Sequence, residues 1–242
     1  FYPLEALRDS GVEEVLVVTG GNDPGDFLRL LGNGRELGLR HIEYVYQKGN
    51  GGIAEALALA EPFAAGGLLC VVLGDNILHK VFADSVRAFL KQAKGARIHL
   101  SPVPDPRRFG VPEFDQDLLV RIVEKPADPP SPFAVTGVYM YDSRVFDIIR
   151  GLEPSARGEL EITDVNNDYI SRSEMSWAVL DGWWSDARTF TSLHEASNLV
   201  WQYGANNPET VPGVPHPSLR SNRGRKAAEA ARAVTAVSPG KT

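Results

Sequence analysis

Residues 68–76 read LLCVVLGDN, and this stretch decides the fold. Its first six residues are apolar without interruption, which is typical of a strand inside a parallel sheet. A glycine ends the apolar run, and Asp75 and Asn76 follow it. Ligands of open parallel sheets bind outside the carboxyl ends of the strands. The stretch therefore predicts a central strand with a carboxylate at the edge where ligands bind.

The chain on both sides of this stretch alternates between strand-like and helix-like patterns. Strands are expected at residues 13–18, 42–47, 68–74, 96–103, 119–124, 133–141 and 176–181. Helical patterns occupy residues 1–9, 23–34, 53–63, 81–94 and 190–202. Apolar strands separated by helices predict an α/β fold with a mostly parallel sheet that is covered on both faces.

The regular pattern dissolves beyond Tyr203. Residues 206–226 are rich in Pro, Asn and Ser and show no periodicity, which is typical of loop or disorder. Residues 225–236 could form a helix on propensity alone, although a short Ala-rich segment is marginal without packing. We therefore expect one domain over residues 1–203 and a Pro- and Ala-rich basic tail, loop or disordered, over residues 204–242.

Composition and charge exclude several classes of protein. The net charge is −6, but six basic residues and one acid follow position 219, so residues 1–219 carry −11. An acidic body argues against nucleic acid as a partner, and we expect the basic tail to be solvated. No apolar run approaches the roughly 20 residues of a membrane span. Cys70 has no second cysteine to pair with, which favours a reducing, cytoplasmic setting.

Two aspartates are candidate metal ligands. Asp75 ends the strand quoted above, and Asp186 lies in DGWWSDARTF, just before the helix expected near Thr189. Taken singly, each aspartate is explained by a turn or a helix cap. Two carboxylates that meet at one sheet edge would instead suit Mg²⁺, which takes one or two carboxylates, phosphate oxygens and waters.

Two further segments carry weaker signals. The loop KGNGGIAEAL leads through three glycines into a helix, so that its backbone N–H groups can face a ligand. In VEKP, Glu124 and Lys125 taken alone form an ordinary exposed charge pair. The five histidines lack metal spacing, and no serine has the setting of a nucleophile elbow. Zinc and hydrolase chemistry are therefore not indicated.

Eight segments, taken in order, resemble the glucose-1-phosphate thymidylyltransferases, a family of sugar nucleotidyltransferases. They are FYPLEALRDSGV, YQKGNGGIAEAL, VVLGDNI, DPRRFGVPEFD, VEKP, FAVTGVYMYD, PSARGELEITDVN and WWSDARTF. Each motif is weak alone, but eight in sequence order over residues 1–203 make a chance similarity very unlikely. PSARGELEITDVN is the motif most specific to the thymidylyl branch. The preference for thymidine over uridine rests on this likeness alone.

The resemblance implies a three-layer α/β/α, Rossmann-like nucleotidyltransferase fold. It also implies a reaction in which dTTP and glucose 1-phosphate give dTDP-glucose and pyrophosphate with the help of Mg²⁺. The sugar phosphate attacks the α-phosphorus of the nucleotide in line, and no covalent enzyme intermediate is needed. Positioning and charge neutralisation would then carry catalysis.

The resemblance also implies roles for particular residues. Asp75 and Asp186 match metal-binding aspartates, and Lys125 matches a lysine that reaches the phosphate of the sugar. Gln47 and Gly52 match positions that contact the thymine base. The positions that match the glucose pocket are Phe109, Gly110, Glu124 and Val135.

The chain departs from the family pattern in several places. Phe109 stands where the family commonly has tyrosine, and Arg188 stands where a glycine usually follows the metal aspartate, so that a bulky cation could crowd the metal site. The family begins with a strand and the loop GGxGTRLxPxT, followed by a lysine near PKPM, and none of this segment is found in the present sequence. The sequence after the last helix also differs from that of the family. We expect the sheet to lack that first strand, the natural protein to be longer, and this chain to form no dTDP-glucose alone. Family members are commonly tetramers, so a homo-oligomer is possible.

Two alternatives stay open. A non-catalytic sugar-nucleotide-binding or regulatory homologue is favoured by Arg188, Phe109 and the absent loop. The retention of Asp75, Asp186, Glu124 and Lys125 favours the enzyme. A glycosyltransferase of similar fold is a weaker alternative, because LGDN lacks the second metal acid that such sites typically have nearby.

Overall fold

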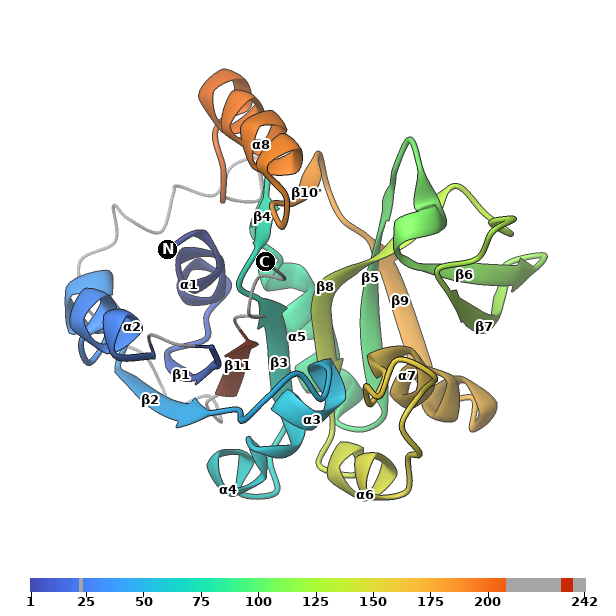
Figure 1. Cartoon of the computed structure of the whole chain (residues 1–242), viewed down its shortest axis with the longest axis horizontal. Helices are drawn as coiled ribbons and strands as arrows, with labels where there is room; N and C mark the ends of the chain where they lie inside the picture. Colours follow the sequence, from blue (N-terminus) through green and yellow to red (C-terminus); the bar gives the residue numbers. More distant parts are fainter. Residues whose placement is uncertain (22–23, 208–231, 237–242) are drawn as a thin grey trace.

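The structure is a computed structural model, and it describes residues 1–21, 24–207 and 232–236. Among these residues, seven strands form one sheet in the order β2-β1-β11-β3-β8-β5-β9 (Figure 1). Their bounds are Glu14–Thr19 (β1), His41–Tyr46 (β2), Leu69–Leu73 (β3), Ala96–Pro102 (β5), Phe133–Tyr141 (β8), Met175–Val179 (β9) and Arg232–Ala236 (β11). Neighbouring strands are parallel except at β8, which is antiparallel to β3 and β5. The predicted α/β fold with a mostly parallel sheet is confirmed.

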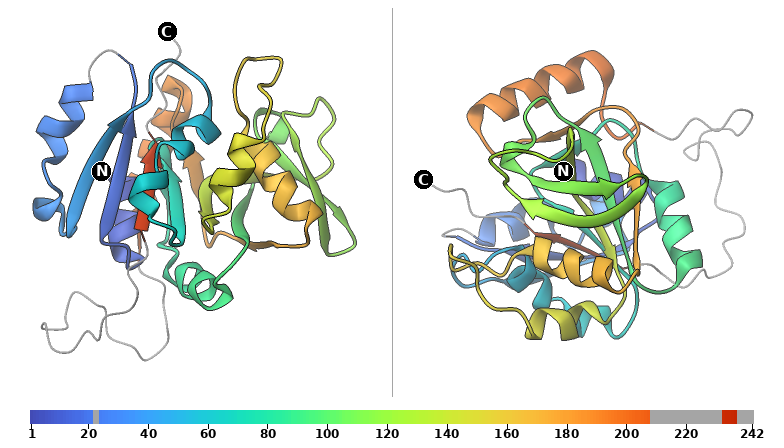
Figure 2. Two further views of the ribbon diagram at one scale, coloured as in Figure 1. Left: turned by 90° about the horizontal axis from the view of Figure 1, so that it is seen from below. Right: turned by 90° about the vertical axis from the view of Figure 1, so that its right-hand side faces the viewer.

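Helices cover both faces of this sheet and complete a three-layer arrangement (Figure 2). One face packs against α3, α4, α6 and α7, and the other packs against α1, α2 and α5. The helix bounds are Tyr2–Asp9 (α1), Pro24–Leu31 (α2), Ile53–Ala58 (α3), Glu61–Ala64 (α4), Ala83–Gln92 (α5), Val145–Arg150 (α6), Ile162–Ser171 (α7) and Phe190–Tyr203 (α8). None of the helices in the described part of the chain is long and apolar enough to cross a membrane.

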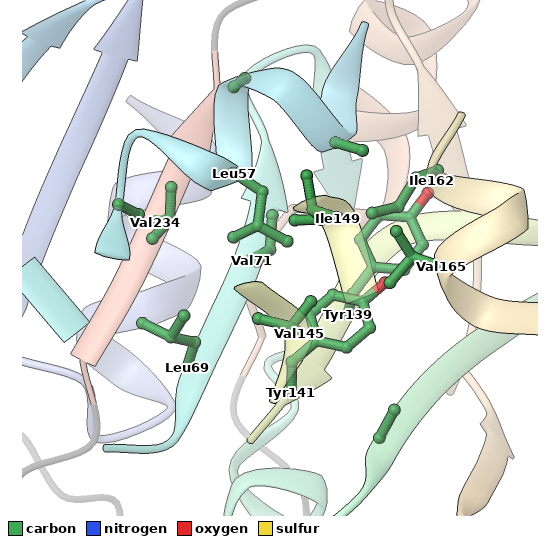
Figure 3. Packing of buried hydrophobic residues seen from close by; sticks show 14 of the residues in the cluster. Leu57, Leu69, Val71, Tyr139, Tyr141, Val145, Ile149, Ile162, Val165 and Val234 are labelled. Atoms are coloured by element: carbon green, nitrogen blue, oxygen red, sulfur yellow. The ribbon is translucent and has the colours of Figure 1, made fainter. Parts of the chain in front are cut away.

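Strand β3 shows why the sheet needs both layers. Leu69 and Val71 belong to the core on one face, whereas Cys70 and Val72 belong to the core on the other. Successive side chains of a strand point to opposite faces, so an uninterrupted apolar run requires cover on both sides. Figure 3 shows Leu69 and Val71 within the first of these cores.

Strand β11 corrects the expectation of loop or helix for this part of the tail. Arg232–Ala236 lies between β1 and β3 and is parallel to both. Ala233 and Val234 are fully buried, one in each core. Without β11, the facing edges of β1 and β3 would leave buried backbone groups unpaired, which is costly. Sheet pairing therefore outweighs the helix propensity of the neighbouring alanines.

The position of β11 also changes the expectation for the middle of the sheet. The sequence predicts a sheet that lacks the first strand of the family. In the described structure, β1 has β2 and β11 as neighbours, and β3 has β11 and β8. The residues of the tail outside 204–207 and 232–236, including most of the segment 225–236, lie outside the described residues.

Four short strands lie outside the main sheet. Strands β6 (Gly110–Asp115) and β7 (Leu118–Glu124) form an antiparallel hairpin, and β4 (Asn76–Leu78) pairs with β10 (Trp184–Asp186). The strand expected at 119–124 is present as β7, but β4, β6 and β10 were not expected. Strands of three residues are too short to give a periodic pattern, and Pro112 obscures β6.

Candidate functional site

A cavity of about 380 Å³ opens at the carboxyl end of β3. Its walls come from the loop after β2, the end of β3, the β6–β7 hairpin, β8, the segment before α7, and the segment between β10 and α8. All nine residues that the sequence singled out line this cavity: Gln47, Gly52, Asp75, Phe109, Gly110, Glu124, Lys125, Val135 and Asp186. The topology therefore brings together residues that are far apart in the chain.

Asp75 and Asp186 meet at one end of the cavity. Asp186 ends β10, which pairs with β4 so that Asp186 lies opposite Asn76, the residue after Asp75. The backbone N–H of Ala187 donates to the carbonyl oxygen of Asp75 at 2.8 Å. Burial raises the pKa of Asp186, and the charge of Asp75 raises that pKa further. The pairing of two short strands thus places two carboxylates side by side.

Arg188 contacts both of these carboxylates. Its Nε lies 3.3 Å from Oδ2 of Asp75 and 3.8 Å from Oδ1 of Asp186. Its backbone N–H also donates to Oδ1 of Asp186 at 3.2 Å. Burial lowers the pKa of Arg188, but the two carboxylates outweigh burial and leave it raised. Arg188, which the sequence suggested could crowd the metal site, thus contacts both carboxylates.

Asn76 holds Asp75 in place. Asn76 is buried, and its Nδ2 donates to Oδ1 of Asp75 at 2.8 Å. Its Oδ1 accepts from the backbone N–H of Gly137 at 2.9 Å and from Nε1 of Trp184 at 2.6 Å. A Cβ on Gly137 would come within 2.6 Å of this amide, so only glycine fits there. Sequence reasoning missed this role, although Asn76 directly follows Asp75.

Gln47 and Gly52 form a second wall of the cavity. Gln47 is buried, and its Nε2 donates to the carbonyl oxygen of Gly52 at 3.1 Å and to Oε2 of Glu55 at 2.7 Å. Gly52 has a φ of +94°, and a Cβ there would lie 2.6 Å from the carbonyl oxygen of Leu160. The loop into α3 therefore needs glycine at this position, both for its conformation and for its close approach to the segment before α7.

Glu124 is the centre of the third wall. Its Oε2 accepts from Oγ1 of Thr163 at 2.6 Å, and its Oε1 lies 3.2 Å from Nζ of Lys125 and 3.3 Å from Nη2 of Arg157. Thr163 and Arg157 were not predicted as site residues. Both lie in PSARGELEITDVN, and the specificity of that motif was the signal that could have found them.

Aromatic and apolar groups close the remaining side. The ring of Phe109 packs edge-on against Trp184, with the ring centroids 5.3 Å apart. Val135 is buried and contributes an apolar surface. A Cβ on Gly110 would approach Ile122 at 3.1 Å, so the β6 backbone runs close to β7 here. This side offers contact to an apolar ring face rather than charge.

The chemistry of the cavity follows from its lining. Four cationic side chains line it (Arg108, Lys125, Arg157 and Arg188), together with five carboxylates (Asp75, Glu124, Glu159, Glu161 and Asp186). Such a mixture suits a ligand that carries both phosphate groups and hydroxyl groups. Within the described residues, no group of three or more His, Cys, Asp or Glu could hold a metal ion. The pair Asp75 and Asp186 supplies two hard oxygen ligands, which is enough for Mg²⁺ when phosphate oxygens and waters complete the shell.

Comparisons with known proteins agree on one family. The model of the family described as nucleotidyl transferase matches residues 1–202. The chain is 40% identical over 204 residues to a glucose-1-phosphate thymidylyltransferase of Neisseria gonorrhoeae, covering 83% of this chain and 70% of that protein. It is 41% identical over 203 residues to the enzyme of the same name from an Actinoplanes species, covering 83% of this chain and 67% of that protein.

Solved structures give a consistent result. A crystal structure assigned as a glucose-1-phosphate thymidylyltransferase from Bacillus anthracis, in complex with sucrose, has a TM-score of 0.78 and 42% identity, covering 82% of this chain and 80% of that chain. A UDP-glucose pyrophosphorylase complexed with UDP-glucose has a TM-score of 0.71 at 22% identity, covering 83% and 85%. The second likeness extends to the fold alone.

Proposed function

The chain belongs to the nucleotidyl transferase family, and on this basis we propose that it is a glucose-1-phosphate thymidylyltransferase, which joins dTTP and glucose 1-phosphate into dTDP-glucose and releases pyrophosphate. The observation that carries the proposal is that all nine residues selected by the family resemblance line one cavity. In this reaction an oxygen of the sugar phosphate attacks the α-phosphorus of the nucleotide, and pyrophosphate leaves from the opposite side.

The two ends of the cavity would hold the two substrates. Gln47 carries a side-chain amide that can pair with the edge of a pyrimidine base, and Gly52 lets the backbone approach that base closely. At the other end, Glu124 can accept hydrogen bonds from sugar hydroxyls, and Lys125 can reach the phosphate of the sugar. Because no covalent intermediate forms, the task of these residues is to align the attacking oxygen with the α-phosphorus.

Asp75 and Asp186 would hold Mg²⁺ in this cavity. The donor set fits this ion, because both ligands are carboxylates and both face a cavity with room for phosphate oxygens. When bound, Mg²⁺ neutralises negative charge on the phosphate oxygens. Asn76 orients Asp75 for this role through the hydrogen bond to Oδ1. Phe109 and Trp184 form an apolar wall that excludes water from the reacting groups.

A direct assay tests this function. The purified chain is mixed with dTTP, glucose 1-phosphate and Mg²⁺, and dTDP-glucose is quantified by chromatography together with released pyrophosphate. Formation of both products in equal amounts would identify the enzyme, and it would contradict the expectation from the sequence that this chain forms no dTDP-glucose alone. Replacing glucose 1-phosphate by glucose removes the attacking phosphate and must abolish the product.

A second candidate function is binding without catalysis, and the contacts of Arg188 with both acids favour it. Such a protein would bind dTDP-glucose through the base and sugar walls and would release no pyrophosphate. Calorimetric titration with dTDP-glucose, run beside the product assay, separates the two. Binding without turnover supports this second function, whereas turnover excludes it.

We also propose domain bounds, a cellular location and self-association for this chain. The nucleotidyltransferase domain would span residues 1–203, with β11 completing its sheet from the tail. We propose a cytoplasmic protein, in line with the single buried cysteine.

Self-association is supported by α8, on which Phe190 is 95% exposed and Trp201 is 89% exposed. Light scattering coupled to size-exclusion chromatography would detect the oligomer.

A further inference from the structure

The backbone on both sides of Arg188 is held in place by hydrogen bonds. Its backbone lies between the end of β10 and Thr189, which caps α8 through reciprocal hydrogen bonds with Ser192. The backbone N–H of Ala187 is bonded to Asp75 and that of Arg188 to Asp186. The loop is therefore fastened on both sides, and the Arg188 side chain extends into the cavity.

The other cations of the cavity are placed differently from Arg188. Arg108 lies over the ring of Phe109, 5.8 Å from its centroid, and its charge lowers the pKa of Asp186 less than that of Arg188 does. Lys125 pairs with Glu124, and Arg157 pairs with Glu161 at 2.8 Å. In the described part of the chain, Arg188 is the cationic side chain within 4 Å of both Asp75 and Asp186. Two carboxylates that repel each other are thus bridged by one guanidinium, which does what a bound cation would do.

The contacts of Arg188 with the two aspartates can also be replaced by those of another cation. The Arg188 side chain is 48% exposed, and its distances to the two carboxylates, 3.3 and 3.8 Å, are longer than those of a tight bidentate pair. The carboxylates are 20% and 10% exposed, so the half-exposed guanidinium is the partner that can leave into solvent. A divalent ion with its higher charge would compete for the same oxygens.

We propose that Arg188 is a built-in counter-cation of the Asp75–Asp186 pair, which a divalent metal must displace before it can bind. The inference rests on the proposed function, because it takes these two aspartates as the metal ligands. Its consequence is that the chain binds divalent ions more weakly than the same pair would without Arg188, and that metal binding frees a guanidinium at the place where substrate phosphates enter.

Metal binding to the free protein tests this inference without reference to turnover. Mn²⁺ is titrated into the full chain and followed by electron paramagnetic resonance, with the shift in thermal unfolding midpoint as a second readout. Arg188→Gln should bind Mn²⁺ about tenfold more tightly, because one positive charge near the site is removed and no side chain must be displaced. Arg188→Lys keeps the charge and should retain weak binding.

A matched control separates this local effect from net charge. Arg107 lies on the short 3₁₀ helix Pro106–Arg108, pairs with Asp105 at 2.8 Å and is outside the cavity lining. Arg107→Gln changes the net charge by the same amount and should leave Mn²⁺ affinity unchanged.

The results of the Mn²⁺ titration distinguish a failure of this inference from a failure of the proposed function. Equal Mn²⁺ affinity in the wild type and Arg188→Gln overturns the inference and leaves the proposed function intact. Absence of Mn²⁺ binding in both also overturns the inference, and the role of the two aspartates is then decided by the product assay, in which substrate phosphates are present. An equal gain in Arg107→Gln would reduce the effect to net charge and likewise overturn the inference.

Discussion

The middle of the sheet and the cavity at its edge are held together by different forces. β1, β11 and β3 are joined by parallel backbone hydrogen bonds and by apolar side chains that are almost fully buried. The cavity walls are joined by charged and amide side chains, such as Arg188 on two carboxylates and Asn76 on Asp75.

This difference indicates that the middle of the sheet determines stability and the cavity determines binding. Burial in the middle of the sheet supplies most of the stability, because each buried apolar side chain contributes about 1.5–3 kcal/mol. The partly exposed ion pairs of the cavity contribute little, but they can be exchanged for bonds to a ligand. Substitutions in the first region should therefore reduce folding, and substitutions in the second should reduce binding or turnover.

The largest effect is expected from a charge in the middle of the sheet. Val234→Asp places a carboxylate on a fully buried position of β11, with no partner for the charge. The free energy of unfolding should fall by more than about 3 kcal/mol, and much of the protein should be unfolded. Urea denaturation followed by circular dichroism measures the loss.

Two further variants calibrate this prediction. Val71→Asp on β3 should cost as much as Val234→Asp, since both residues lie in the same core. Val120→Asp on β7, where the residue is 40% exposed, should cost less than about 1 kcal/mol. If Val234→Asp behaves like Val120→Asp, β11 is not a central strand.

The next effect concerns activity and leaves the fold intact. Where the assay described above detects turnover, Asp75→Asn should lower the rate of dTDP-glucose formation by about a hundredfold or more, because the carboxylate that would hold the metal is lost. The unfolding midpoint should change little. Asp181→Asn is the matched control, since Asp181 is 76% exposed and pairs only with Lys80 among the described residues. Unchanged turnover in Asp75→Asn would remove Asp75 from the proposed mechanism.

Asn76 lies where the two regions meet, so its removal should affect both. Asn76→Ala leaves the buried backbone N–H of Gly137 and the partly buried Nε1 of Trp184 without this acceptor. We expect a loss of about 2–4 kcal/mol in the free energy of unfolding, and a lower turnover because Asp75 loses its hydrogen-bond donor. Asn198→Ala, on the exposed surface of α8, should leave both quantities unchanged. A purely structural role would lower stability without changing the turnover of the folded fraction.

The smallest effect is the pH dependence due to Asp186. Its pKa is raised in the folded protein by burial and by Asp75, so the folded state binds a proton more readily than the unfolded chain. The stability that this group contributes in acid is lost as the pH rises from the ordinary aspartate pKa through the raised value. Asp186→Asn should flatten the stability profile in that range, whereas Asp181→Asn should leave it unchanged. An unaltered profile in Asp186→Asn would contradict the raised pKa.

Much of the sheet was predictable because its strands carry their own signals. β8 was expected at residues 133–141 and is found there, β3 is one residue shorter than expected at each end, and β5 is one residue shorter at its end. The start of α8 near Thr189 was likewise readable from the polar residue before an apolar run. Continuous apolar runs and helix caps are local properties, so no tertiary contact is needed to recognise them.

The identity of the site residues was also available from the sequence, but their contacts were not. Motif likeness selected nine residues, and all nine line the cavity. It did not select Asn76, Thr163 or Arg157, which hold the selected carboxylates. Thr163 and Arg157 come from a different segment than Glu124, and Asn76 is a neighbour of Asp75 whose other bonds reach Gly137 and Trp184. Their side chains look like ordinary turn, surface or capping residues until the fold brings these groups together.

By itself, therefore, the sequence determined the class of fold, most of the strands and helices, and the residue types at the ligand-binding edge. The tertiary structure alone decided that Arg232–Ala236 is a strand between β1 and β3, and that Arg188 bridges two aspartates from different segments. The physical reason is the same in both cases. A strand with weak local preference forms where neighbouring strands offer unpaired backbone groups, and a charge finds its partner only where folding has already placed two others.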